Sequence, residues 1–123
     1  MVEGSKRTYD ANFKHPLTLQ DLNDLKVADI PAHDILTGGF PCQPFSNAGS
    51  RKGIDDPRGQ LYQQTFKFID RLDPKVVVFE NVRGILSTKL ENGKLIDEIV
   101  DTLTNKYDYH VSYRLMNFSH FGV

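Results

Sequence analysis

The one cysteine of the chain, Cys42, lies in a segment whose composition suits a nucleophile. A short apolar run leads into two glycines, and Pro41 and Pro44 then flank the thiol. Because each proline fixes φ and lacks a backbone donor, neither regular helix nor regular strand is expected around the cysteine. A passive structural cysteine lies more often within a periodic apolar run. The pattern therefore favours a reactive thiol just beyond a strand, where open α/β sheets place their chemistry.

A carboxylate and an amide, Glu80 and Asn81, directly follow a second apolar run. Residues 76–79 are three valines and a phenylalanine, which is typical of a strand buried on both faces. If this strand and the one expected at residues 34–37 are neighbours, Cys42 and Glu80 meet at the same rim of the sheet. A thiol and a carboxylic acid at one rim suggest a nucleophile and an acid that act on one substrate.

This pair suits attack on an electron-poor ring carbon, such as carbon 6 of a pyrimidine. Addition of the Cys42 thiolate would place negative charge on the ring. A carboxylic acid at nitrogen 3 would offset that charge, so Glu80 must be protonated at least transiently, which burial at a strand end would favour. The resulting enamine is nucleophilic at carbon 5 and could accept a methyl group. A base would then remove the carbon-5 proton and let the thiol leave.

Further motifs extend this two-residue signal along the chain. They are residues 41–46 (Pro-Cys-Gln-Pro-Phe-Ser), 48–49 (Ala-Gly), 55–59 (Asp-Asp-Pro-Arg-Gly) and 79–82 (Phe-Glu-Asn-Val), with Gly84 and Leu86. Together they closely resemble the cytosine-5 DNA methyltransferase family, in its motif order and over nearly the whole chain. The resemblance implies that Cys42 is the covalent nucleophile and that Glu80 contacts a cytosine flipped out of the duplex. It also implies that Asn81 helps to hold the Pro-Cys loop.

The resemblance assigns further residues to the DNA substrate. Residues 46–59 correspond to the family's mobile loop that closes on DNA, and their basic side chains would meet phosphates. The implied DNA contacts are Gln43, Ser46, Arg51, Lys52 and Arg58. Taken singly, the three basic residues are more simply read as ordinary surface charges.

The resemblance also implies a binding site for the cofactor S-adenosylmethionine. Asp21 and Leu22 resemble the segment whose acid binds the adenine, although Asp21 could simply solvate a turn. The methionine end would be lined by Gly39, Phe40 and Pro41, and Leu61 would pack near the adenine. The four histidines share no spacing that suggests a metal site, so no metal is expected.

Parts of the family's pattern fall outside residues 1–123. The family begins with a strand and a Phe-x-Gly-x-Gly loop that cradles the cofactor, followed by a second strand that ends in a ribose-binding acid. It continues beyond the position of Val123 into a Gln-x-Arg-x-Arg segment, a target-recognition domain and a C-terminal helix. Residues 1–123 therefore correspond to one partial catalytic domain, as a truncation, a broken reading frame or one piece of a split enzyme. We expect no efficient methyl transfer from this chain alone.

Other functions compete with DNA methylation. A non-catalytic nucleic-acid-binding or assembly piece could complement a partner chain that carries the missing motifs. RNA is an alternative substrate, because one branch of the family modifies transfer RNA. A thiol redox protein is disfavoured, because the chain has no resolving cysteine. A restriction–modification role is expected only because compact bacterial members of the family commonly serve one.

Composition limits the class of protein. The chain has 123 residues and a net charge of −1, which suit one small domain and argue against a strongly basic nucleic-acid-binding module. A single cysteine excludes an internal disulfide. No stretch is apolar enough for a membrane span, and the first residues lack the apolar core of a secretion signal. We therefore expect a cytoplasmic protein with no membrane partner.

The elements that must position these residues follow from the apolar periodicity. We expect a strand at residues 34–37, a long loop at 38–59, a helix at 60–72, a strand at 76–79, a helix at 94–107 and a half-exposed strand at 109–115. Nearer the N-terminus, a helix is expected to end around residues 9–13 and a turn or short helix to lie at 17–25.

This alternation predicts an α/β fold with a mainly parallel sheet and right-handed crossovers. The resemblance implies, more closely, the Rossmann-like sheet of an S-adenosylmethionine-dependent methyltransferase, with helices on both faces. That sheet would lack its first strands, and the recognition domain would be missing.

Overall fold

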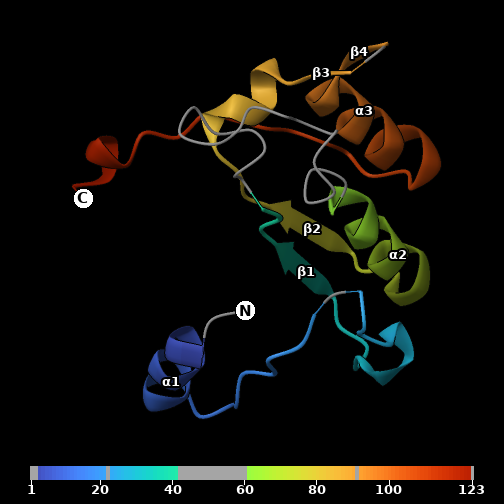
Figure 1. Ribbon diagram of the computed structural model, residues 1–123. Coiled ribbons are helices and arrows are strands. Elements are labelled where there is room, and N and C mark those ends of the chain that lie inside the picture. The colour runs from blue at the N-terminus through green and yellow to red at the C-terminus, as the bar shows by residue number, and fades with distance from the viewer. Residues whose placement is uncertain (1–2, 22, 42–60, 91, 123) are drawn as a thin grey trace. The chain divides into compact units, whose positions relative to one another are not determined.

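The computed structural model describes residues 3–21, 23–41, 61–90 and 92–122. Its helices are α1 (Glu3–Asn12), α2 (Tyr62–Leu72) and α3 (Leu95–Asp101), and its strands are β1 (Ile35–Gly38), β2 (Val76–Phe79), β3 (Lys89–Leu90) and β4 (Gly93–Lys94) (Figure 1). Short 3-10 turns cover Val27–Asp29, Arg83–Ser87 and Phe118–Phe121, and a π turn over Thr102–Lys106 continues α3.

The described residues divide into two compact units. The first unit holds the residues up to Leu36 together with Gln63–Val77, and the second unit holds the described parts of Thr37–Tyr62 and Val78–Val123.

Strands β1 and β2 are hydrogen-bonded neighbours in a two-stranded sheet. In the first unit the Val76 amide donates to the Asp34 carbonyl at 3.0 Å, and in the second unit the Glu80 amide donates to the Gly38 carbonyl at 3.0 Å. Donor and acceptor numbers rise together, which defines a parallel pair, and the two arrows in Figure 1 point the same way. The predicted strands are thus confirmed as parallel neighbours, with their carboxyl ends at one edge.

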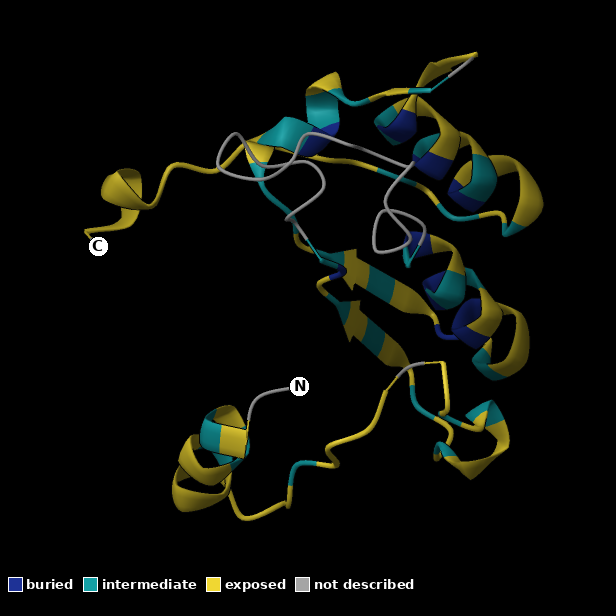
Figure 2. Ribbon diagram, in the orientation of Figure 1, coloured by how far each residue is buried: buried dark blue, intermediate teal, exposed yellow. Residues whose placement is uncertain are grey.

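The predicted burial of residues 76–79 on both faces is wrong. Val76 and Val78 are 48% and 52% exposed and alternate with half-buried Val77 and Phe79. Ile35 in β1 is 59% exposed, and Figure 2 shows the same alternation along both strands. A continuous β-branched run is compatible with strand geometry, but only packed neighbours can bury its second face. The described residues do not show the expected cover of helices on both faces.

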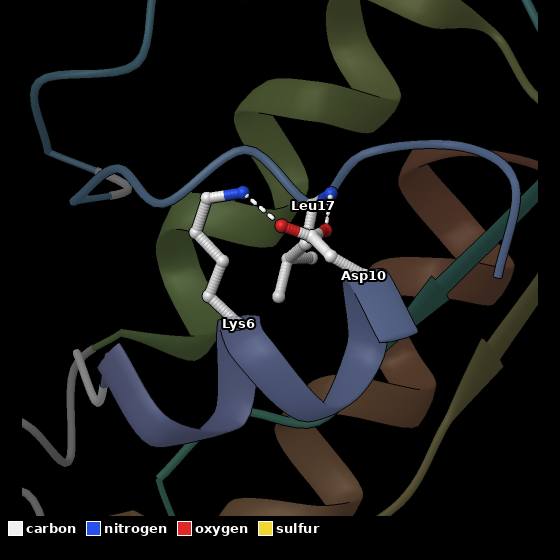
Figure 3. Close-up of polar contacts among 3 residues, drawn as sticks. All are labelled: Lys6, Asp10 and Leu17. Atoms are coloured by element: carbon white, nitrogen blue, oxygen red, sulfur yellow. Dashed lines mark hydrogen bonds and ion pairs between the residues drawn. The ribbon is translucent and has the colours of Figure 1, made fainter. Parts of the chain in front are cut away.

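In the first unit, α1 is held to the chain that follows it by Asp10. The Asp10 carboxylate accepts a hydrogen bond from the Leu17 amide at 2.9 Å and pairs with Lys6 one turn earlier (Figure 3). The pKa of Asp10 is lowered below its ordinary value of 3.8, mainly by the hydrogen bond from the Leu17 amide and to a smaller extent by Lys6. Helix α1 ends at Asn12, within the range predicted for its end.

Helix α2 begins and ends close to the predicted bounds of residues 60–72. Phe68 and Ile69 are buried on it, and Asp73, with φ of 46°, takes the chain out of the helix before the buried Pro74. A left-handed residue followed by proline stops a helix. The nearby Lys75–Asp34 ion pair joins two largely exposed side chains and contributes little to stability.

The core of the second unit is built on α3. Leu95, Ile99 and Leu103 are buried at helical spacing, and Ile85 from the preceding 3-10 turn is buried as well. The predicted helix at 94–107 is therefore confirmed, with α3 and its π turn covering residues 95–106.

The sequence did not predict the β3–β4 hairpin that precedes α3. Lys89 lies opposite Lys94 and Leu90 opposite Gly93 in an antiparallel pair. Two residues per strand are too few to give an alternating pattern, which is the signal for a strand. Gly93 has φ of 136°, which disfavours other residues at this position.

The predicted strand at residues 109–115 is wrong. Within the described part of the chain this segment is paired into neither sheet. Tyr109 and Val111 are half-buried, but Tyr113 and Leu115 are 61% and 53% exposed. Alternating apolar residues favour an extended backbone, yet a strand also needs a neighbour for its hydrogen-bond ladder.

Among the helices of the described residues, none is long and apolar enough to cross a membrane.

Candidate active site at the ends of two parallel strands

The candidate site lies where β1 and β2 end. Gly39, Phe40 and Pro41 follow β1, while Glu80 and Asn81 follow β2. All five belong to the second unit. Because the two strands are parallel neighbours, the segments that leave them start side by side (Figure 1).

Asn81 ties these two segments together. Its Nδ2 donates to the Phe40 carbonyl oxygen at 3.0 Å, and its Oδ1 accepts from the Val82 amide at 2.9 Å. Both ends of the side-chain amide are used, so the orientation of the group is defined by its partners. The chain leaving β1 is therefore anchored to the end of β2 one residue before Pro41.

The Glu80 carboxylate lies beside Gly39. A Cβ built on Gly39 would stand 3.7 Å from Glu80 Oε2 and 3.9 Å from the Glu80 carbonyl oxygen. These are ordinary van der Waals distances, so a side chain at this position would contact Glu80 without a clash.

Glu80 is exposed, so the burial expected for this residue at the end of its strand is wrong. Strand β2 ends at Phe79, and the residue that follows is accessible to solvent. The site residue Asn81 is half-buried.

Phe40 packs as a core residue. It is 7% exposed, and its ring centroid lies 6.2 Å from that of Tyr62 and 6.1 Å from that of Phe79. The contact with Phe79 is edge to face, which aromatic rings favour. The assignment of Phe40 to the methionine end of the cofactor stays a prediction.

Sequence reasoning missed Tyr62 and Glu98. The Tyr62 hydroxyl donates to Glu98 Oε1 at 2.9 Å, and Tyr62 is only 3% exposed. Tyr62 lies within the helix predicted at residues 60–72, but nothing in the spacing of the two residues predicts that their side chains meet.

The residues predicted to bind the cofactor fall into both units. Gly39 is exposed and Pro41 and Leu61 are half-buried in the second unit, whereas Asp21 is exposed in the first. Asp21 Oδ1 accepts from the Asn23 amide at 2.8 Å and from Asn23 Nδ2 at 3.0 Å, which is a turn stabilised by its own side chain. The turn predicted for this segment is present.

The remaining predicted residues lie outside the described part of the chain. They are Cys42, Leu22, Gln43, Ser46, Arg51, Lys52 and Arg58. Their assignments stay predictions. Among the residues that are described, no group of three or more histidine or acidic side chains is placed to hold a metal ion.

Comparison with known proteins decides the family. The family model described as "C-5 cytosine-specific DNA methylase" matches residues 3–123. The chain belongs to this family. It is 38% identical over 116 residues to the type II methyltransferase M.Bsp6I of Bacillus sp. (strain RFL6), covering 94% of this chain and 36% of that protein. It is 40% identical over 115 residues to the type II methyltransferase M.HaeII of Haemophilus aegyptius, covering 94% of this chain and 35% of that protein.

The chain thus spans about a third of the length of these curated relatives. The resemblance inferred from the motifs around Cys42 and Glu80 is confirmed at the level of the family.

Proposed function

We propose that the chain forms the central part of a DNA (cytosine-5) methyltransferase catalytic domain and acts through a covalent Cys42 intermediate. The observation that carries the proposal is the parallel strand pair, which sets Pro41, directly before Cys42, at the same sheet edge as Glu80 and Asn81. Membership of the family and the type II methyltransferases among its relatives support the reaction. They also support a restriction–modification role.

The chain's own residues would carry the reaction as follows. The Cys42 sulfur forms a bond to carbon 6 of a flipped-out cytosine, and the electron pair moves into the ring. Glu80 donates a proton or hydrogen bond at nitrogen 3, which stabilises that charge. After carbon 5 has been methylated, loss of its proton to a base restores the double bond and releases the Cys42 thiolate. Asn81 holds the Phe40 carbonyl, and so the approach to Cys42, in place.

The residues present fit the cofactor in kind. S-adenosylmethionine, when bound, supplies an electrophilic methyl group. Gly39 is exposed and carries no side chain, which would let a ligand approach its backbone closely beside Glu80. Pro41 and Leu61 offer half-buried apolar surface in the second unit. The assignment of Asp21 and Leu22 to the adenine rests on the family resemblance alone.

DNA would be the partner of the segment after Cys42. Gln43 and Ser46 stand next to the nucleophile in the sequence, and Arg51, Lys52 and Arg58 supply the positive charge that phosphates require. Because the chain as a whole carries a net charge of −1, this local cluster rather than overall charge would steer DNA to the site.

Trapping on DNA that contains 5-fluorocytosine tests the proposal. Fluorine at carbon 5 cannot leave as a proton does, so the covalent adduct accumulates. We expect an adduct that needs S-adenosylmethionine, with the segments of the family outside residues 1–123 supplied in trans. It should be lost in Cys42→Ser and reduced in Glu80→Gln, whereas the control Glu3→Gln should leave it unchanged. An adduct that persists in Cys42→Ser would exclude the mechanism.

Two further arms separate the alternatives. The same trap with 5-fluorocytosine in RNA would reveal an RNA substrate. Binding of DNA by the complemented protein without any adduct would favour a non-catalytic piece that completes a partner chain. We expect neither result, and the chain without added segments should transfer methyl groups poorly.

A further inference from the structure

A part-buried hydrogen bond connects the start of α2 to α3 in the second unit. The Tyr62 hydroxyl donates to Glu98 Oε1 at 2.9 Å, and the tyrosine is 3% exposed although Glu98 itself is exposed. Burying a phenol hydroxyl without an acceptor costs free energy, because its hydrogen bonds to water are lost and not replaced. The carboxylate therefore fixes the Tyr62 ring in one place.

That ring lies against the residue whose carbonyl Asn81 holds. The Tyr62 and Phe40 centroids are 6.2 Å apart, and Phe40 also contacts Phe79. The Phe40 carbonyl accepts from Asn81 Nδ2 at 3.0 Å. Ring and carbonyl belong to one residue, so the ring contacts and the Asn81 hydrogen bond together restrain Phe40. Phe40 is thus fixed from two sides, two positions before Cys42.

We propose that Tyr62, held by Glu98, is a positioning residue that sets the Phe40 carbonyl and, through it, the approach to Cys42. The link to Phe40 stands on the described contacts alone, whereas its catalytic consequence rests on the function proposed for Cys42. Tyr62 itself need not touch substrate or cofactor.

Four variants of the full chain isolate this link. Tyr62→Phe removes only the hydroxyl, and Glu98→Ala removes its acceptor. Glu98→Gln keeps an acceptor oxygen and should restore the wild-type behaviour. Tyr113→Phe removes a hydroxyl from a side chain that is 61% exposed and serves as the matched control.

Hydrogen exchange at two backbone amides measures the positioning directly. The Glu80 amide bonds to the Gly38 carbonyl beside the Phe40–Asn81 contact, and the Leu95 amide bonds to the Thr88 carbonyl elsewhere in the second unit. In Tyr62→Phe and Glu98→Ala we expect exchange of the Glu80 amide to rise about tenfold, which is the order of one lost hydrogen bond to a charged group. The Leu95 amide should stay unchanged. An equal rise at both amides, or no rise at Glu80, would overturn the proposal.

The trapping assay then tests the step from Phe40 to Cys42. At saturating DNA the rate of adduct formation should fall about tenfold in Tyr62→Phe, because misplacement of reacting groups lowers the chemical rate. The DNA concentration for half-maximal rate should not change. An unchanged adduct rate together with faster Glu80 exchange would refute the link to Cys42. If the unaltered sequence forms no adduct, the proposed function fails, and hydrogen exchange still decides whether Tyr62 positions Phe40.

Discussion

The amide of Asn81 offers the sharpest test of how the site is held together. Asn81→Ala removes the hydrogen bond to the Phe40 carbonyl and the one from the Val82 amide. A typical intramolecular hydrogen bond contributes ~0.5–1.5 kcal/mol net, so the two together predict a loss of roughly 1–3 kcal/mol in the free energy of unfolding. Because Asn81 is only half-buried, water can replace part of this loss, and a value near the middle of the range is expected.

Urea denaturation followed by far-ultraviolet circular dichroism measures this loss. With a denaturant slope of ~1–3 kcal/mol/M, the unfolding midpoint should fall by about 1 M urea. Asn81→Asp separates the two bonds, because a carboxylate can still accept from the Val82 amide but cannot donate to the Phe40 carbonyl. This variant should also be less stable than the unaltered chain, because a carboxylate oxygen would then face the Phe40 carbonyl oxygen and neither can donate a hydrogen bond.

Asn105→Ala is the matched control. Asn105 Nδ2 donates to Asp101 Oδ1 on an exposed surface, so its loss should change the free energy of unfolding by less than ~0.5 kcal/mol. If Asn81→Ala costs no more than Asn105→Ala, the anchoring role of Asn81 is refuted.

Three other perturbations follow from packing and charge. Leu95→Ala should lower the free energy of unfolding by about 2–5 kcal/mol, because Leu95 is fully buried, and a urea midpoint equal to that of the unaltered chain would contradict this. The lowered pKa of Asp10 means that its stabilising contacts are present above the unfolded value of 3.8 and are lost as pH falls through the lower folded value. Asp10→Asn should therefore reduce helicity at neutral pH and flatten its dependence on acid, which a circular dichroism titration checks. Val78→Thr should decrease self-association in sedimentation velocity, because an apolar side chain 52% exposed on the β1–β2 sheet favours contact between molecules. An unchanged sedimentation profile would argue that this face is not where molecules meet.

The elements that were predicted correctly carry their signal locally. Helices α2 and α3 place apolar residues at helical spacing, and β1 and β2 are short β-branched or apolar runs with glycine or proline beside them. The segment at 109–115 has an equally regular pattern but forms no described strand. The alternation of this segment predicts which side chains share a face. Whether a strand forms also depends on a neighbouring strand, which the sequence of the segment does not reveal.

The candidate site shows the same division. The motifs around Cys42 and Glu80, in their order along the chain, were enough to place the chain in its family. The exposure of Glu80 and the Tyr62–Glu98 hydrogen bond were not predictable, because both depend on how separate elements pack. Packing of this kind joins residues with no periodic relation in the sequence, and only a three-dimensional structure reveals it.

The anchor between Asn81 and Phe40 has a consequence for tolerance to mutation. Asn81 contacts a main-chain carbonyl, which every amino acid possesses, so replacing Phe40 leaves that acceptor in the chain. The aromatic contacts of Phe40 depend instead on its side chain. Saturation mutagenesis would then give two distinct profiles. Position 40 would accept residues according to their size and shape, and position 81 would accept them according to whether they can donate a hydrogen bond.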